Sequence, residues 1–371
     1  MPLSRRDLLS ASALLLARPL AAASGAATRP SSAAAGPIVL AWNENPYGPS
    51  PAARASMRDA AADACRYPDD DAAALATALA RHEGVGIEHV TIGTGSGELL
   101  HALGLSCARA GGELIAAQPT YAELPDYARL LGATVRSVPV DKALRHDLSA
   151  MRAAVTGRTR AVYLCNPNNP TGTALAAGAI ATFIASLPDA VTTILDEAYI
   201  DFADDPDVRS AAQLIEGHQR VVVLRTFSKL HGMAGARVGY ALTRPDVAAE
   251  LASLCMTSPN VFAMRAARAS LEDRAFLADC RRRILASRAR MTAELTRLGY
   301  RYAAPQGNFI FFDTAAPLER LEEFMRARDI LVGRKFPPYD TWCRITIGTE
   351  PEVEAFLQAL RAYARRPARA A

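Results

Sequence analysis

Lysine is almost missing from this sequence. Of its 42 lysine and arginine residues, 39 are arginine, and the three lysines are Lys142, Lys229 and Lys335. A chain that uses arginine for surface charge has little need of lysine there, and only lysine loses its proton readily when it is buried. Each retained lysine is therefore a candidate for a reactive amine, with a solvated surface lysine as the alternative.

Other scarcities exclude whole classes of protein. No apolar run approaches the roughly 20 residues that cross a bilayer, so a membrane span is not expected. The net charge is +4 at pH 7, of which +3 falls in residues 1–36, so nothing indicates nucleic acid or an acidic membrane as a partner. The six cysteines are widely scattered without zinc or redox spacing, and no metal site is expected.

The N-terminus has the pattern of an export signal. Ser4-Arg5-Arg6-Asp7-Leu8-Leu9 is a twin-arginine sequence, followed by a short apolar run over 11–17 and small residues over 19–27. This pattern predicts a twin-arginine signal and linker over residues 1–36, and hence a periplasmic protein. The alternative is an N-terminal extension with chance arginines on a cytoplasmic protein.

The middle of the chain alternates short apolar strands with helices. The predicted strands cover 89–92, 114–117, 135–140, 161–165, 191–195, 221–224 and 238–242. This alternation is typical of a mostly parallel sheet with helices on both faces. Polar motifs follow five of these strands, and ligands of such sheets bind at the carboxyl ends of the strands. We therefore expect one site at this edge.

After residue 245 the pattern changes. A long helix over 262–298 is predicted, then strands over 300–302, 308–312 and 343–347 with helices between and after them. This order indicates a second, smaller α+β domain. We predict a large domain over 65–250 and a small domain that combines 37–64 with 251–371.

Two strand ends carry charged groups that suit a cofactor. Lys229 follows the strand 221–224 and is flanked by the hydroxyls of Thr226 and Ser228. Asp196 ends a very apolar strand, where a carboxylate is costly unless a cation or hydrogen-bond donor meets it. A protonated ring nitrogen would be such a partner; a helix cap or a structural ion pair is the alternative.

Further side chains at the same edge suit a flat, phosphorylated ring. Gly95, Ser96 and Gly97 open a helix whose N–H groups can bind phosphate, although a lone turn of this kind is most often only a turn. The other candidates are Tyr121 for stacking, Asn169 and Tyr199 for a ring hydroxyl, and Thr226, Ser228 and Arg237 for phosphate. With an amine and a carboxylate, this set specifies pyridoxal 5′-phosphate, with Lys229 forming the Schiff base and Asp196 keeping the pyridine protonated.

These motifs resemble those of the class I/II aminotransferases, which have the aspartate-aminotransferase-like fold of pyridoxal phosphate fold type I. Within that group the sequence is most similar to the histidinol-phosphate aminotransferases. The matching segments, in the family's order, are Asn43–Pro51, Arg66-Tyr67-Pro68, Gly95-Ser96 with Glu98, Pro119-Thr120-Tyr121, Asn168–Gly172, Asp196–Tyr199, Ser228-Lys229 with Gly235 and Arg237, Asn308-Phe309 and Arg344–Gly348.

The resemblance implies a fold and a reaction. The fold would be α/β, with a mostly parallel seven-stranded sheet in the large domain. Lys229 would carry a proton between the donor's Cα and the cofactor's C4′, and Tyr67 would reach the phosphate of a partner subunit in a homodimer. The remaining implied substrate residues are Arg344, Arg334, Asn45 and Tyr47. The substrates would be a small amino donor, an amino acid or histidinol phosphate, and a 2-oxo acid such as 2-oxoglutarate.

The sequence also departs from the family's pattern. Position 97 is Gly where that family usually has Asp, and the loop Val332–Pro338 is shifted, which moves the second substrate arginine to Arg334. A periplasmic location conflicts with cytoplasmic histidine biosynthesis. Two alternatives stay open: a pyridoxal phosphate decarboxylase or lyase on the same fold, and a periplasmic ligand-binding protein without catalysis.

Overall fold

A computed structural model describes residues 36–109, 111–217, 220–256 and 258–365. The predicted twin-arginine segment lies outside these residues. Within them, no helix combines the length and the apolarity needed to cross a membrane.

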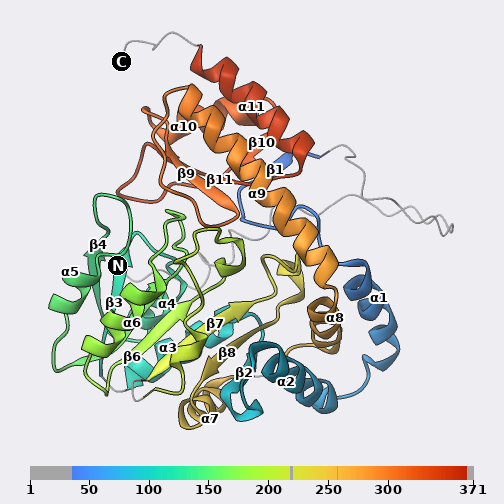
Figure 1. The fold of residues 1–371 in the computed structure, drawn as a ribbon, viewed down its shortest axis with the longest axis vertical. Coiled ribbons are helices and arrows are strands. Elements are labelled where there is room, and N and C mark those ends of the chain that lie inside the picture. Colours follow the sequence, from blue (N-terminus) through green and yellow to red (C-terminus); the bar gives the residue numbers. More distant parts are fainter. Residues whose placement is uncertain (1–35, 110, 218–219, 257, 366–371) are drawn as a thin grey trace, which may run out of the picture. The chain divides into compact units, whose positions relative to one another are not determined.

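A seven-stranded sheet forms the centre of the fold (Figure 1). Its strands are β2 (Val90–Gly93), β3 (Glu113–Gln118), β4 (Thr134–Pro139), β5 (Thr159–Cys165), β6 (Thr192–Asp196), β7 (Val221–Thr226) and β8 (Gly239–Thr243). The order is β2-β8-β7-β6-β5-β3-β4. Strand β8 runs in one direction, and the other six strands all run in the opposite direction. The predicted mostly parallel α/β sheet is confirmed, and the five strands that precede polar motifs all end at one edge.

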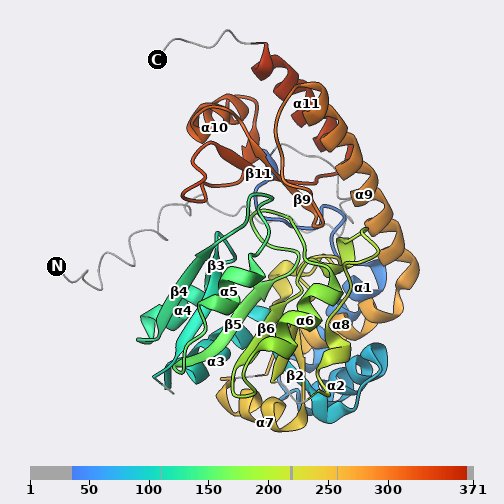
Figure 2. The ribbon, with the colours of Figure 1, turned by 60° about the vertical axis from the view of Figure 1, so that its left-hand side comes forward.

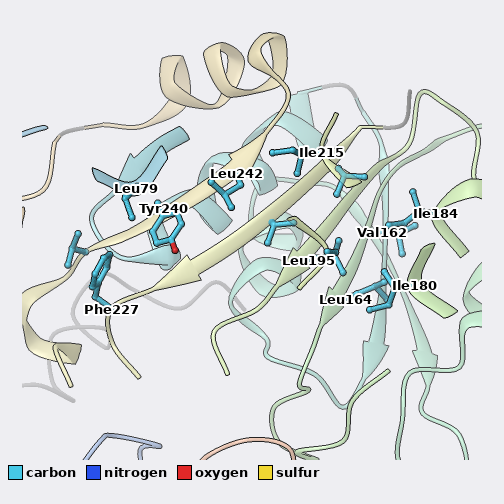
Figure 3. Packing of buried hydrophobic residues seen from close by; sticks show 14 of the residues in the cluster. Leu79, Val162, Leu164, Ile180, Ile184, Leu195, Ile215, Phe227, Tyr240 and Leu242 are labelled. Atoms are coloured by element: carbon cyan, nitrogen blue, oxygen red, sulfur yellow. The ribbon is translucent and has the colours of Figure 1, made fainter. Parts of the chain in front are cut away.

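Helices cover both faces of this sheet, because both faces are apolar. One face packs on α3 (Ser96–Arg109), α4 (Glu123–Leu130) and α7 (Pro245–Leu254). The other face packs on α2 (Asp69–Glu83), α5 (Leu148–Ala153), α6 (Ala177–Ser186) and α8 (Val261–Glu272), the last of which also contacts α1 (Pro51–Asp59) (Figure 3). Successive side chains of a strand point to opposite faces, so Leu224 lies on the α3 face and Val223 on the α2 and α8 face.

The C-terminal part has its own core. It contains α9 (Arg274–Arg297), α10 (Leu318–Arg326) and α11 (Glu350–Ala364) around two small sheets. One pairs β9 (Phe309–Asp313) with β11 (Trp342–Thr346) (Figure 2). The other pairs β1 (Ile38–Leu40) with β10 (Ile330–Val332), which are labelled in Figure 1. Through β1, residues near 40 join this part; the division at residues 65 and 250 stays a prediction.

Two predicted elements differ in the structure. The single helix over 262–298 is two helices, because Asp273 lies between them and its side chain accepts a hydrogen bond from the Phe276 amide at the start of α9. Aspartate favours such an N-cap over a helix interior. The predicted strand over 300–302 is reduced to an isolated bridge between Tyr302 and Phe312.

Candidate active site

Lys229 lies just after β7, in a polar environment made largely of backbone. Its Nζ donates to the carbonyl oxygens of Asn43 (3.2 Å) and Trp42 (3.5 Å) and lies 5.4 Å from the Tyr199 ring centroid. Burial, and then the positive charge of Arg344, lower the pKa of the Lys229 amine from its ordinary value to about 8. A substantial fraction of this amine is therefore neutral near physiological pH.

Asp196 ends β6 and is almost fully buried. Its carboxylate accepts hydrogen bonds from the Tyr163 hydroxyl (2.9 Å) and from the Ala198 amide (3.1 Å). Within the described ranges it has no salt bridge within 4.0 Å, and burial raises its pKa despite these bonds and the charge of Lys229. A cationic ring nitrogen would relieve this cost of burial.

Two asparagine amides and one tyrosine hydroxyl lie in contact beside Lys229. The Tyr199 hydroxyl accepts from Nδ2 of Asn169 (3.3 Å) and from Nδ2 of Asn43 (3.2 Å). Asn43 has a positive φ of 54°, and its backbone is held by Asn308, which donates to its carbonyl at 3.1 Å. Asn169 and Tyr199 thus meet as predicted, and Asn43 joins them.

The start of α3 and the end of β7 form a cradle of donors. A Cβ on Gly95, which has a φ of +77°, would lie 2.5 Å from Nη2 of Arg237, so a side chain there would displace this guanidinium and strain the backbone. Gly239 of β8 would likewise bring a Cβ within 2.5 Å of the Ser96 amide nitrogen. Opposite, the hydroxyls of Thr226 and Ser228 lie 2.9 Å apart and are buried. Helix-terminal N–H groups, hydroxyls and one guanidinium are typical of a phosphate site.

Arg344 of β11 is buried and faces the same amide of Asn169. Its Nη1 donates to Oδ1 of Asn169 (2.7 Å) and its Nη2 to the Ala41 carbonyl (2.6 Å), while Nε is buried without a partner in the described residues. The guanidinium carbon lies 5.0 Å from the centroid of the Phe336 ring, and that of Arg334 lies 4.5 Å from it. One aromatic ring therefore contacts both predicted substrate arginines.

The loop Val332–Pro338 lies against the backbone of β11 at position 333, where the Gly333 amide donates to the Arg344 carbonyl (3.0 Å). A Cβ on Gly333 would collide with the carbonyl oxygen of Arg344, so this backbone excludes any side chain there. Arg334 is exposed, and its Nη1 donates to the carbonyl of Lys335 (3.1 Å).

Several predicted residues lie outside this cluster or at its rim. Tyr67 is 96% exposed, between α1 and α2, and Tyr121 is 37% exposed. Gly97 is at the start of α3, and a Cβ added there would lie 3.9 Å from Nη2 of Arg237. Asn45 donates to the Leu230 carbonyl (2.7 Å), and the ring of Tyr47 lies 5.4 Å from the Arg283 guanidinium on α9.

A cavity of about 370 Å³ adjoins the site. Ser228, Asn45 and Thr346 contribute to its walls, whereas Lys229 and Arg344 do not. The cavity therefore lies beside Lys229 and Arg344 and is lined by the predicted substrate residue Asn45. It is separate from the donor groups around Gly95 and Arg237.

The sequence interpretation missed Asn43, Tyr163 and Asn308 as members of the site. Asn43 and Asn308 were available only as parts of matching segments. Tyr163 was a better signal, because a tyrosine within the apolar strand 161–165 needs a partner for its hydroxyl, and that partner is Asp196.

The residues present fit pyridoxal phosphate. The cradle at Gly95 suits its phosphate, the buried Asp196 suits a ring nitrogen, and the Tyr199 junction suits a ring oxygen. The amine with a lowered pKa suits its aldehyde.

Comparisons with known proteins agree with this site. Residues 35–360 match the family "Aminotransferase class I and II". A histidinol-phosphate aminotransferase of Moorella thermoacetica is 38% identical over 328 residues, 87% of this chain and 84% of that protein. An aromatic amino acid aminotransferase of Rhodococcus jostii is 40% identical over 325 residues, 87% of this chain and 89% of that one. A histidinol-phosphate aminotransferase of Sinorhizobium meliloti, solved in complex with pyridoxal-5′-phosphate, has a TM-score of 0.80 and 28% identity over 88% of this chain and 90% of that chain.

The fold is thus the aspartate-aminotransferase-like fold of pyridoxal phosphate fold type I, as predicted. The chain belongs to the class I and II aminotransferase family.

Proposed function

We propose that this aminotransferase moves an amino group from histidinol phosphate or an aromatic amino acid to a 2-oxo acid, with 2-oxoglutarate as the expected acceptor. The observation that carries this proposal is the junction at Asn169, whose amide contacts both the Tyr199 phenol and the Arg344 guanidinium. One side chain links the ring-binding half of the site to its anion-binding half. Such a link would hold the cofactor and the donor in a fixed relative orientation, which favours reaction.

Pyridoxal phosphate, when bound, supplies a ring that accepts the electron pair left at the donor's Cα. Asp196 would pair with the ring nitrogen, and Asn169 with Tyr199 would bind the ring oxygen. Tyr121 would stack on the ring. The phosphate would be held by Gly95, Ser96, Gly97, Thr226, Ser228 and Arg237.

Lys229 is the proposed proton carrier. With a pKa of about 8, its amine would be able to accept and return a proton at the donor's Cα. Asn43 and Trp42 orient Nζ through their carbonyl oxygens, so within the described part of the chain the amine is held without an ion pair.

Arg344 is the proposed anchor for the donor's anionic end. Asn169 and Ala41 occupy two of its nitrogens, and its Nε is buried without a partner among the described residues. The Arg344 side chain would therefore have to shift to present Nε to an anion. A carboxylate or a phosphate would satisfy it. Arg334 would add a second positive charge at the outer side of the Phe336 ring, which favours a donor with a phosphate.

A panel of donors tests the proposal. Purified protein is incubated with 2-oxoglutarate and histidinol phosphate, phenylalanine, tyrosine or aspartate, and glutamate is measured. Glutamate formed from histidinol phosphate or from the aromatic donors, and much less from aspartate, is the expected result. Glutamate formed only from aspartate would contradict the proposed donors.

The same incubation separates the alternatives. Carbon dioxide or ammonia released without glutamate would indicate a decarboxylase or lyase. Failure of the protein to retain a visible absorption band after unbound pyridoxal phosphate has been removed would favour a binding protein without catalysis.

We further propose a homodimer with shared sites. The near-complete exposure of Tyr67, with Trp42 65% exposed, supports a surface that a second copy covers. Mixing inactive Lys229→Ala subunits with inactive Tyr67→Ala subunits should restore part of the activity, because some mixed dimers have one intact site. Mixed subunits without any activity would contradict shared sites.

Export by the twin-arginine route is likewise a proposal, supported by Arg5 and Arg6 in the sequence. That route moves folded proteins, so the cofactor would be loaded before export. Replacing both residues with lysine should move the protein from the periplasmic to the cytoplasmic fraction of the cell. An unchanged distribution would contradict this proposal.

A further inference from the structure

The site has a buried ion cluster directly behind it. Asp196 and Glu197 are consecutive at the end of β6, and Arg225 and Thr226 are consecutive at the end of β7. The register pairs Asp196 with Leu224, and the Glu197 amide donates to the Leu224 carbonyl (3.0 Å). Because side chains alternate along a strand, Asp196 and Thr226 face the site while Glu197 and Arg225 face the opposite side of the sheet.

Arg225 lies among three carboxylates on that side. Its Nε is 3.4 Å from Glu197, its Nη1 3.5 Å from Asp201 and its Nη2 3.8 Å from Glu83. The Arg225 side chain is 14% exposed and Glu197 is 1% exposed. The hydroxyl of Tyr240, on β8, donates to Glu83 at the end of α2 (2.5 Å). The cluster therefore joins β6, β7 and β8 to α2.

Glu197 is anchored a second time. Its carboxylate accepts from the Ser210 hydroxyl (2.7 Å) and from the Ala211 amide (2.7 Å). Burial raises the pKa of Glu197, and Arg225 opposes that rise. Through Arg225 the same carboxylate is connected to Asp201, which lies two residues after Tyr199.

The residues on either side of Lys229 pack against the same region. The ring of Phe227 lies 6.0 Å from that of Tyr240, and both residues are labelled in Figure 3. The Phe227 ring also lies 4.5 Å from that of His231. His231 in turn has Nδ1 at 2.7 Å from the Ser270 hydroxyl of α8. Phe227 and His231, two residues before and two residues after Lys229, therefore both pack on the side of the sheet that faces away from the site.

We propose that Arg225 is a positioning residue that acts through Glu197 and Asp201, setting where Asp196, Tyr199 and Lys229 stand relative to one another. Buried ion clusters add little net stability compared with apolar packing. Ion pairs of 3.4, 3.5 and 3.8 Å nevertheless tie three carboxylates to one side chain. Glu197, Asp201 and Arg225 each lie within two positions of a site residue, namely Asp196, Tyr199 and Thr226. The effect on the cofactor rests on the proposed function, whereas the effect on the Lys229 amine does not.

The scarcity of lysine makes a direct test possible. Lys142→Arg with Lys335→Arg leaves Lys229 as the single lysine, whose ¹³C-labelled Cε reports the protonation of its amine by NMR. Arg225→Met, close in length but uncharged, is made in this background. The matched control is Arg220→Met, which removes an arginine just before the same strand that pairs with Glu250 near the surface. Each protein is titrated without cofactor, and its affinity for pyridoxal phosphate and its melting temperature are measured.

The parent protein should titrate with a pKa of about 8. In Arg225→Met we expect this pKa to rise by about one unit, because a displaced amine gains water and loses the burial that lowers it. We expect the affinity for pyridoxal phosphate to fall about tenfold. Arg220→Met should change neither quantity.

An Arg225→Met protein that melts earlier, yet keeps the parent pKa and affinity, would overturn the proposal and leave Arg225 a purely structural residue. Arg225→Lys separates charge from geometry: it should recover part of the melting temperature but not the pKa, because one amine cannot contact all the carboxylates. Full recovery of the pKa by lysine would also contradict the geometric account. A parent protein that binds no pyridoxal phosphate would refute the proposed function, while the titration would still decide the role of Arg225.

Discussion

Two buried carboxylates lie at opposite edges of the central sheet. Glu113 begins β3, and it accepts hydrogen bonds from Arg136 (2.7 Å) and Arg158 (2.5 Å). Those bonds, that of Arg136 first, lower the pKa of Glu113 to about 2. Asp196 ends β6, has no arginine beside it in the described part of the chain, and has a raised pKa because it is buried.

The difference teaches how to separate a structural carboxylate from one that awaits a ligand. Both side chains are buried at strand ends, but the protein itself neutralises only Glu113. The lysines show the same contrast. A hydrogen bond to Glu319 raises the pKa of Lys335, whereas burial lowers that of Lys229. Asp196 and Lys229, whose charged forms are disfavoured by burial, therefore both lie at the carboxyl edge of the sheet, where the site is.

The largest expected effect is at Lys229. Lys229→Ala should lower transamination by about 10⁴-fold or more, because the proton carrier and the point of cofactor attachment are both lost. Lys335→Ala should leave the rate within about twofold, because surface ion pairs contribute little. Initial rates of glutamate formation and the visible absorption of the bound cofactor measure both. A comparable loss of transamination rate in the two variants would contradict a special role for Lys229.

The paired carboxylates come next. Asp196→Asn should lower kcat by about 10³-fold, since it removes the charge that we propose keeps the ring nitrogen protonated. Glu113→Gln should leave kcat unchanged and lower the melting temperature, because Arg136 and Arg158 lose their shared partner. Steady-state kinetics and thermal unfolding of each variant test this. A kcat loss at Glu113 as large as that at Asp196 would break the comparison.

A smaller effect is expected at the substrate arginines. Arg344→Met should raise the KM for the donor about 100-fold, since it removes the buried charge that we propose pairs with the donor's anion. Arg334→Met should raise it less than about tenfold for an amino acid, because Arg334 is exposed. The ratio of KM values for histidinol phosphate and phenylalanine in Arg334→Met shows whether this residue favours phosphate; an unchanged ratio would exclude that role.

The last prediction concerns the pH dependence of cofactor capture, which needs no substitution. Only the neutral amine of Lys229 attacks an aldehyde, and its pKa is lowered to about 8. The rate of capture by cofactor-free protein should therefore rise about tenfold per pH unit below pH ~8 and level off above it. Stopped-flow absorbance measures this rate. A rate that keeps rising through pH ~10 would mean that Lys229 has the pKa of an ordinary lysine.

Much of this arrangement was predictable from strand ends. Asp196, Asn169 and Lys229 each follow an apolar strand, and parallel strands bring their carboxyl ends to one edge. The positions of Asn43 and Asn308 were not predictable in the same way, because their contacts join segments 265 residues apart. The neutralisation of Glu113 was hidden too, since Arg136 and Arg158 reach it only through the pairing of β3 with β4 and β5.

The domain boundaries and the roles of the site residues stay predictions, as do the dimer and the export route. The break at Asp273 shows a different limit. The helical spacing of apolar residues continues over 262–298, so it does not indicate a break. The break occurs because the Asp273 side chain accepts a hydrogen bond from the Phe276 amide and so caps the start of α9.

The central claim is that Lys229, alone among three lysines, attaches the cofactor. The most direct measurement is borohydride reduction of the protein with bound pyridoxal phosphate, followed by peptide mass spectrometry. The account predicts the phosphopyridoxyl group on the peptide that contains Lys229 and none on those that contain Lys142 or Lys335. Label on either of the other lysines, with Lys229 unmodified, would contradict it.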